Sequence, residues 1–221
     1  MHTKASRLRK SRSPKVDPAS GNRLPPGQVL TERFPILHEG AVPEYDTGDW
    51  SLRLFGTLDR PIELGYADLQ ALPQRVLRCD IHCVTRWSKF DTEWGGVHLQ
   101  DLLQTFDIQP TSSYVMAHAD PDYQTNLLLD DLLQPQSLLA THYAGQPLTA
   151  QHGWPLRLVI AGRYFWKSAK WLRGLEFVAQ EQPGFWEQNG FHLHADPFAE
   201  QRFSGEELDI AEDAWLEKEF D

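Results

Sequence analysis

The sequence predicts a single domain of the α+β class, with many short strands and few short helices. Its 221 residues, 41% of them hydrophobic, are enough to bury one substantial core. Strand patterns outnumber helix patterns and do not alternate with them regularly, which argues against a doubly wound sheet. We therefore expect one β-rich mixed domain over residues 29–203, flanked by two segments of different composition.

The expected elements follow from the spacing of apolar residues. Strands are expected where these residues alternate or form short runs, at 51–58, 77–83, 113–119, 156–161 and 171–179. A helix is expected at 98–106, where a buried stripe recurs at helical spacing: Leu99, Leu102, Leu103 and Phe106. Shorter helical segments are expected at 66–72, 130–133 and 137–140.

The two ends of the chain have opposite charge. Residues 1–28 combine basic side chains with Ser, Pro and Gly, so we expect a disordered basic arm that cannot bury enough apolar surface to fold. Residues 204–221 open with the capping-box pair Ser204 and Glu207, and an apolar stripe through Trp215 follows. They predict an acidic amphipathic helix, docked on the domain itself or, as the alternative, on a partner.

Charge and cysteine content exclude several classes of protein. The net charge of -10 argues against a nucleic-acid partner. No apolar run long enough for a signal peptide follows the basic start, and none is long enough to span a membrane. The two cysteines, Cys79 and Cys83, are too close along one strand for a disulfide. We therefore expect a cytoplasmic protein with no membrane span.

Alternation in the strand at 77–83 places Cys79 and Cys83 on its apolar face and His82 on the opposite face. A cysteine on such a face is most often a small buried hydrophobe. Zinc binding by Cys79, His82 and Cys83 is an alternative, although the alternation separates His82 from both cysteines. Cys83 is expected at the exit of the strand.

A second group of chemically active residues lies between 151 and 170. It contains five possible anion donors: His152, Arg157, Arg163, Lys167 and Lys170. The planar fork of Arg157 could hold a phosphate, and Ser168 offers a hydroxyl and a backbone N–H. Because no glycine-rich phosphate motif is present, the residues alone leave an anion site and a solvated basic loop equally open.

Three ordered segments resemble the catalytic domains of sulfite oxidases and methionine sulfoxide reductases, which bind a molybdenum–pterin cofactor. The first is HCVTRWSKFDTEWGGVHLQDLL at 82–103, with a cysteine, a tryptophan and a leucine-rich helix. The second, at 138–162, contains the H-G-x-P-x-R pattern within LLATHYAGQPLTAQHGWPLRLVIAG. The third, FPILHEGAVP at 34–43, is similar to the stretch that makes the first pterin contacts. The resemblance runs from about residue 33 to 179 and implies the sulfite oxidase fold.

The resemblance also implies roles for individual residues. Cys83 matches the molybdenum ligand, and the cofactor contacts would be His38, His152, Arg157, Ser168, Ala169 and Lys170. Arg86, three residues after the ligand, would bind an oxyanionic or oxo substrate, with a surface salt bridge as the alternative. The implied activity is oxygen-atom transfer on a small sulfur or nitrogen oxy-compound, with electrons exchanged with an unidentified partner. No haem is expected, because the chain lacks the length for a haem domain.

Two departures from the family pattern leave the substrate open. Thr141 stands where sulfite oxidases carry a tyrosine, with Tyr143 two positions later. Thr85 stands where the sulfoxide reductases carry a glutamate. Two other functions therefore remain as alternatives: a non-catalytic molybdopterin or anion-binding module, and the small zinc-binding protein.

Overall fold

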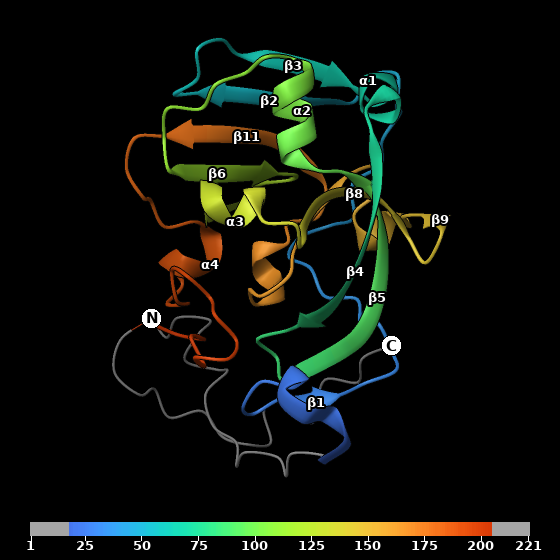
Figure 1. Cartoon of the computed structure of the whole chain (residues 1–221), viewed down its shortest axis with the longest axis vertical. Helices are drawn as coiled ribbons and strands as arrows, with labels where there is room; N and C mark the ends of the chain where they lie inside the picture. Colours follow the sequence, from blue (N-terminus) through green and yellow to red (C-terminus); the bar gives the residue numbers. More distant parts are fainter. Residues whose placement is uncertain (1–17, 205–221) are drawn as a thin grey trace.

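The computed structural model describes residues 18–204 and folds them into two mixed sheets with few short helices, which confirms the α+β class (Figure 1). One sheet, here sheet A, runs in the order β1 (Val29–Leu30), β5 (Trp87–Val97), β8 (Ser137–Tyr143) and β10 (Arg157–Ile160). Two further strands join it, β4 (Gln74–His82) beside β5 and β9 (Gln146–Pro147) beside β8. All its pairs are antiparallel except β1 with β5.

The other sheet, sheet B, has five strands. Their order is β3 (Ile62–Gly65), β2 (Ser51–Gly56), β11 (Leu172–Val178), β6 (Tyr114–Ala119) and β7 (Tyr123–Leu128), with only β2 and β11 parallel. The α-helices are α1 (Tyr66–Ala71), α2 (Leu99–Thr105), α3 (Leu129–Leu133) and α4 (Phe185–Gln188). Three 3-10 turns complete the described elements: η2 (Pro18–Arg23), η3 (Ala150–His152) and η4 (Phe165–Lys167). In Figure 1, α2 lies across sheet B, and β4 and β5 run together away from it toward β1.

Strands β8 and β10 form a wall between two hydrophobic cores. The main core joins sheet B and α2 to one face of these strands through Leu139, Leu158 and Ile160. A second core, here called the aromatic core, lies on their other face and includes Leu138 and Val159, together with Cys83, Trp87, Trp94, Tyr164 and Trp166. Because both faces of β8 and β10 are buried, their sequences are continuous apolar runs instead of alternating ones.

This double burial corrects one expected element. The segment 137–140 is the start of β8 and not a helical turn, and its backbone pairs with β10. A short apolar run fits a buried strand and a buried helical turn equally well, and here the pairing with neighbouring strands decides. The stripe at 98–106 does form α2, whose N-cap His98 accepts a hydrogen bond from the Gln100 backbone N–H.

The packed domain begins before residue 28, where the disordered basic arm was expected to end. Residues 1–17 lie outside the described part of the chain, but Leu24 and Gln28 are buried against the domain. The Gln28 side-chain amide donates to the Cys83 carbonyl (3.0 Å) and accepts from the Ser88 hydroxyl (3.3 Å). Composition could not reveal this, because a polar side chain is buried when specific partners satisfy it. The acidic helix expected at 204–221 lies outside the described residues apart from Ser204.

None of the helices described between residues 18 and 204 is long and apolar enough to cross a membrane.

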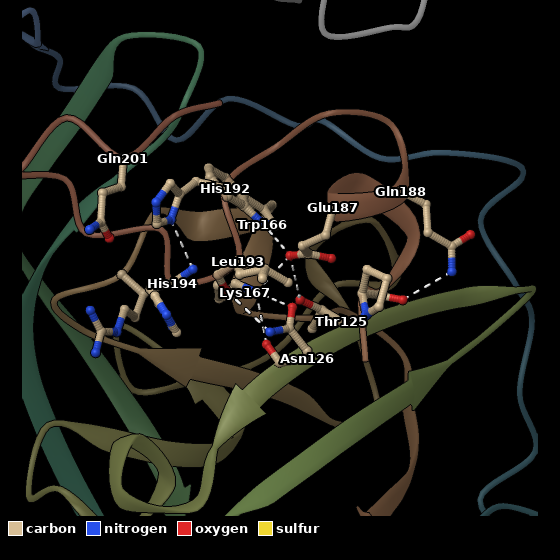
Figure 2. A network of polar contacts seen from close by, with 12 residues as sticks. Thr125, Asn126, Trp166, Lys167, Glu187, Gln188, His192, Leu193, His194 and Gln201 are labelled. Carbon is tan, nitrogen blue, oxygen red and sulfur yellow. Dashed lines mark hydrogen bonds and ion pairs between the residues drawn. The ribbon is translucent and has the colours of Figure 1, made fainter. Parts of the chain in front are cut away.

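A buried ion pair ties η4 to α4 (Figure 2). Lys167 Nζ donates to Glu187 Oε1 at 2.6 Å and to the Asn126 side-chain oxygen at 2.6 Å. The same Glu187 oxygen accepts from the Trp166 indole N–H (2.8 Å), while its other oxygen is buried without a hydrogen-bond partner in the described chain. The network therefore fixes the segment that leads from η4 toward Lys170.

We expect Lys167→Met to destabilise the protein by about 3–5 kcal/mol, because it leaves the Glu187 carboxylate buried and uncompensated. Urea unfolding followed by circular dichroism measures the loss. The matched control is Arg78→Met, which removes an exposed arginine paired with Glu93 and should cost much less, since water solvates both charges. Equal losses in the two variants would contradict a structural role for the buried pair.

Candidate functional site

Cys83 begins a tight turn between β4 and β5. Its backbone N–H donates to the Trp87 carbonyl (2.8 Å), and its own carbonyl accepts from the Arg86 N–H (3.0 Å). Arg86 closes the turn in the left-handed region, at φ 74°. The turn therefore holds Cys83 at the exit of β4, where alternation of the strand predicted it.

The Cys83 thiol is free and buried. The Thr85 hydroxyl donates a hydrogen bond to its sulfur at 3.1 Å. Burial raises the pKa of the thiol, while the Thr85 hydrogen bonds and the positive charges of Arg202 and Lys170 oppose that rise. The surroundings thus supply positive charge on which a thiolate ligand to a metal could depend.

Lys170 and Arg157 approach one another across Gly153, whose φ is 108°. A side chain at this position would place its Cβ 3.0 Å from Arg157 Cβ and 3.1 Å from Lys170 Cβ. Lys170 Nζ donates to the carbonyl of Gln151 (2.7 Å), in η3. Glycine is therefore required both for the turn after His152 and for the close packing of the two cationic residues.

Arg157 is buried completely at the start of β10. Its two terminal nitrogens donate to the carbonyls of His152 and Ser168, each at 2.9 Å. Its guanidinium lies 4.5 Å from the ring centre of Phe165, and burial lowers its pKa to about 9. The sequence suggested that this guanidinium could bind a phosphate, but its terminal nitrogens donate to backbone carbonyls instead. Arg157 therefore joins the two loops that flank β10, and its contact with a cofactor stays a prediction.

Ser168 and Ala169 are also buried. The Ser168 hydroxyl accepts from the Ile160 N–H (3.0 Å), and the Ala169 carbonyl accepts from the Leu158 N–H (2.8 Å). Both contacts hold β10 in place, so these residues shape the loop that carries Lys170. Their expected contact with a cofactor also stays a prediction.

Positive charge is disfavoured throughout this group. Burial and the nearby Arg157 lower the pKa of Lys170 to about 7, although Cys83 acts in the opposite direction. Burial, followed by the charges of Lys170 and Arg157, lowers the pKa of His152 to about 4. Among residues 18–204, neither Lys170 nor Arg157 forms an ion pair with a carboxylate. An anionic group bound here would relieve this repulsion.

His38 belongs to the same region through an aromatic contact. Its ring meets the edge of Trp171 at 5.4 Å between centres, and the Trp171 indole donates to the Ala150 carbonyl (2.7 Å). His38 is exposed, and its Nδ1 lies 3.1 Å from the Gly40 carbonyl oxygen. The structure thus places His38 beside η3, which ends at His152.

The basic stretch at 151–170 divides into two groups that do different work. Arg163 forms a two-pronged pair with Asp131, at 3.0 and 2.8 Å, and Lys167 is held by Glu187. The expectation of five converging anion donors was therefore wrong for these two residues, because carboxylates already neutralise them. His152, Arg157 and Lys170 remain.

The alternative of a zinc site is wrong for the described chain. His82 Nδ1 pairs with the Ser88 hydroxyl (2.8 Å), and the Cys79 sulfur lies 3.7 Å from the Thr92 hydroxyl. Residues 18–204 contain no group of three or more His, Cys, Asp or Glu side chains placed to hold a metal ion. His82 is nevertheless buried, and its ring meets that of Phe198 with 5.7 Å between centres.

Sequence reasoning did not foresee the central place of Phe34. Its ring stacks on His152 with 4.3 Å between centres. It also contacts four aromatic rings of sheet A and η4: Trp87, Trp94, Tyr143 and Phe165. Phe34 opens the segment FPILHEGAVP at 34–43, in which the resemblance implies a role for His38. Tyr143 lies in this aromatic cluster, whereas Thr141 is buried and bonded to His142.

Arg202 was also missed, because it lies after the segments on which the resemblance depends. Its guanidinium donates to the carbonyl of Val84 (2.9 Å), within the Cys83 turn, and to that of Pro26 (3.0 Å). Arg86, which closes that turn, makes no ion pair within the described residues, so the alternative of a surface salt bridge is not supported.

We expect the unfolding free energy to fall as pH drops from about 6.5 to about 4, partly because of His152. Its pKa is lowered on folding, so in this window the unfolded chain binds a proton that the folded chain excludes. His152→Gln should therefore lose less stability than the wild type over the same window. Urea unfolding at a series of pH values measures both, and parallel curves would contradict the assignment.

Known proteins with a similar sequence or fold show the family of this chain. The sequence pattern of the oxidoreductase molybdopterin binding domain matches residues 39–186. The uncharacterised oxidoreductase YuiH of Bacillus subtilis (strain 168) is 47% identical over 183 residues, which cover 82% of this chain and 92% of that protein. A putative protein-methionine-sulfoxide reductase subunit of Azospira oryzae, YedZ1, is 29% identical over 181 residues, which cover 80% of this chain and 68% of that protein.

A solved structure shares the fold. The sulfane dehydrogenase SoxCD from Paracoccus pantotrophus superposes with a TM-score of 0.59 at 20% identity, over 65% of this chain and 41% of that one. The match to the family covers more than half of the chain and includes Cys83, His152, Arg157 and Lys170. The chain therefore belongs to the oxidoreductase molybdopterin-binding domain family, as the resemblance implied, and is a molybdopterin-dependent oxidoreductase.

Proposed function

We propose that the chain binds a molybdenum–molybdopterin cofactor through Cys83 and transfers an oxygen atom to or from a small sulfur or nitrogen oxy-compound. The observation that carries the proposal is the buried free thiol of Cys83 near Lys170 and Arg157, neither of which has a carboxylate partner among residues 18–204. The sulfoxide-reductase name of the relative in Azospira oryzae supports a sulfur compound as substrate. Electrons would pass to or from a separate partner, which this proposal leaves unnamed.

The donor set suits such a cofactor. A thiolate is a soft ligand that favours a redox-active metal, and cationic side chains favour the phosphate of the pterin. The buried Nε2 of His152 has no hydrogen-bond partner in the described chain and is free to bond a polar group of the cofactor. Cys83 would hold the metal, and Lys170, His152 and His38 would face the pterin and its phosphate.

When bound, the cofactor supplies the oxygen-atom exchange and the two-electron chemistry. The residues of the chain supply position and electrostatics. Thr85 orients the Cys83 sulfur through its hydrogen bond, and Arg157 holds the loops of His152 and Ser168 in register. The aromatic side chains around Phe34 exclude water from the same region, which strengthens every charge interaction within it.

The proposal also includes the cellular compartment in which the protein resides. Cys79 and Cys83 are both free thiols, which a reducing environment preserves, so we propose a cytoplasmic location. The alternative of a non-catalytic binding module gains no specific observation in its favour.

We expect Cys83→Ser to abolish oxygen-atom transfer and to lower molybdenum content, because a hydroxyl is a harder and weaker donor than a thiolate. The variant and the wild type are made in a host that assembles the cofactor, and metal content is measured by mass spectrometry. Cys79→Ser is the matched control, since Cys79 is the other thiol in the described chain and bonds Thr92 instead. Full turnover by Cys83→Ser would exclude Cys83 as the essential ligand.

We expect Arg157→Ala to lower pterin content, because it releases both loops and removes a buried positive charge. Fluorescence of the oxidised pterin after denaturation measures occupancy. Arg157→Lys should restore part of it by keeping the charge without the planar fork. The control is Arg163→Ala, which removes an arginine from the same stretch that pairs with Asp131 and not with the loops around Arg157. Unchanged pterin content in Arg157→Ala would rule out this role.

A further inference from the structure

One long segment of the described chain has no regular secondary structure and crosses the candidate site. It comprises residues 31–49, here called the strap, and it joins β1 to β2. Figure 1 shows these two strands near opposite ends of the domain, so the strap runs from one end to the other. Structureless loops longer than about 12–15 residues are uncommon in compact domains and are often functional. The strap therefore calls for a role beyond connecting two strands.

Side chains, and not backbone pairing, hold the strap in place. At its start, the Thr31 N–H donates to the Ser88 carbonyl of β5 (2.9 Å). Among residues 18–204, neither residues 32–38 nor residues 41–48 make a backbone-to-backbone hydrogen bond to another segment. Segments with few such bonds open at a lower free-energy cost than the strands of a sheet. The strap can thus move without breaking any strand pair.

Three rings of the strap lie against the loops that carry the cationic residues. The pairs, with the distance between ring centres, are Phe34 with His152 (4.3 Å), His38 with Trp171 (5.4 Å) and Tyr45 with Trp154 (6.2 Å). Two of these partners flank Gly153, and the third follows Lys170. Phe34 also packs against the aromatic core, of which Cys83 is a part. The strap therefore contacts both the loops expected to hold the cofactor and the core that contains the expected metal ligand.

One side-chain hydrogen bond fastens the second half of the strap. The Tyr45 hydroxyl donates to the Asp120 carboxylate at 2.8 Å, and Arg173 Nε lies 3.9 Å from the same carboxylate oxygen. Burial, followed by the hydrogen bond to Asp120, raises the pKa of Tyr45, so its hydroxyl remains a donor at neutral pH. The Asp120 backbone N–H in turn donates to the carbonyl of Trp171 (3.1 Å). Tyr45 and Asp120 thus connect the strap to the residue after Lys170.

Trp171 lies where the strap meets the cationic loops. Its backbone is in the left-handed region, at φ 54°, which is rare for a bulky side chain. Its indole N–H donates to the Ala150 carbonyl of η3 (2.7 Å), and its ring meets that of His38. Strain of this kind persists where the surroundings over-determine a conformation, and it clusters at ligand clamps and switch regions. The strained residue therefore joins η3 and the Lys170 loop to the strap.

We propose that the strap is a lid, which opens to admit the molybdenum–pterin cofactor and closes behind it, with the hydrogen bond between Tyr45 and Asp120 as its latch. This inference rests on the proposed function for the identity of the ligand. Cys83 and Arg157 are buried, so a ligand as large as this cofactor reaches them only if a covering segment moves. The strap covers this region without strand pairing, and its latch sets the rates of loading and of loss.

The first test follows opening of the strap in the full-length protein without cofactor. The native thiol of Cys83 is the reporter, and its alkylation by iodoacetamide is timed by mass spectrometry in a Cys79→Ser background. Tyr45→Phe removes only the latch hydroxyl and should speed alkylation about tenfold, because that hydroxyl bonds a charged group. Asp120→Asn should have a smaller effect in the same direction, since its amide oxygen still accepts. Tyr114→Phe, the matched control, removes a hydroxyl from β6 and should change nothing.

The second test separates a latch from a simple binding contact. Cofactor-free protein is mixed with pterin cofactor extracted anaerobically from a purified molybdenum enzyme, and bound pterin is followed by its fluorescence after oxidation. Loss from the loaded protein is measured after transfer to cofactor-free buffer. A latch limits movement in both directions, so Tyr45→Phe should speed uptake and loss alike, by about tenfold. A residue that only contacts the cofactor would speed loss and leave uptake unchanged.

A double variant shows whether the two latch residues act as one device. The rates of Tyr45→Phe/Asp120→Asn should match those of Tyr45→Phe alone, because the hydrogen bond is already lost in the single variant. Thermal unfolding of each variant identifies a substitution that acts through folding. If Tyr45→Phe does not fold, Asp120→Asn carries both measurements.

The outcomes distinguish this inference from the proposed function. Alkylation of Cys83 that is unchanged in Tyr45→Phe would overturn the lid, even if the protein contains molybdenum and turns over. Faster loss without faster uptake would also overturn it. If the protein takes up neither molybdenum nor pterin, the proposed function fails, but alkylation that depends on the latch would still support a lid over Cys83.

Discussion

The site depends most on the hydrogen bonds that the Arg157 guanidinium donates. This guanidinium is buried against Trp94 and Phe165 of the aromatic core, and it joins the loop before β10 to the loop after it through the carbonyls of His152 and Ser168. Burying a cation without a carboxylate is unfavourable, and here three carbonyl acceptors and two aromatic rings compensate for the lost water. The position of Lys170, and through it the charge near Cys83, follows from this one side chain.

Much of the fold could be predicted from the spacing of apolar residues, because strands with one buried face and the stripe of α2 carry a clear period. The exceptions have physical causes. Strand β8 is buried on both faces, so its apolar run has no period that separates strand from helix. Strand β5 is long but mixes Ser, Lys, Asp, Thr and Glu with its aromatic residues, and its pairing on both sides defines it more than its composition does.

The sequence predicts only those parts of the candidate site that depend on local pattern. Cys83 could be chosen because strand alternation and a local motif agree on it. The basic stretch could not be divided from sequence, since the carboxylates that neutralise Arg163 and Lys167 come from Asp131 and Glu187, far away in the chain. Phe34 and Arg202 reach the site from outside its two main segments. Only tertiary packing could bring these residues together.

The shared wall of β8 and β10 has a thermodynamic consequence. The same two strands line the main core on one face and the aromatic core, which includes Cys83, on the other, so this side of the site cannot loosen without disturbing the main core. Ligand binding and global folding are then linked equilibria: occupancy of the site stabilises the whole domain by mass action. By the same linkage, a cavity in the main core, remote from every residue that touches a ligand, would weaken retention of the bound group.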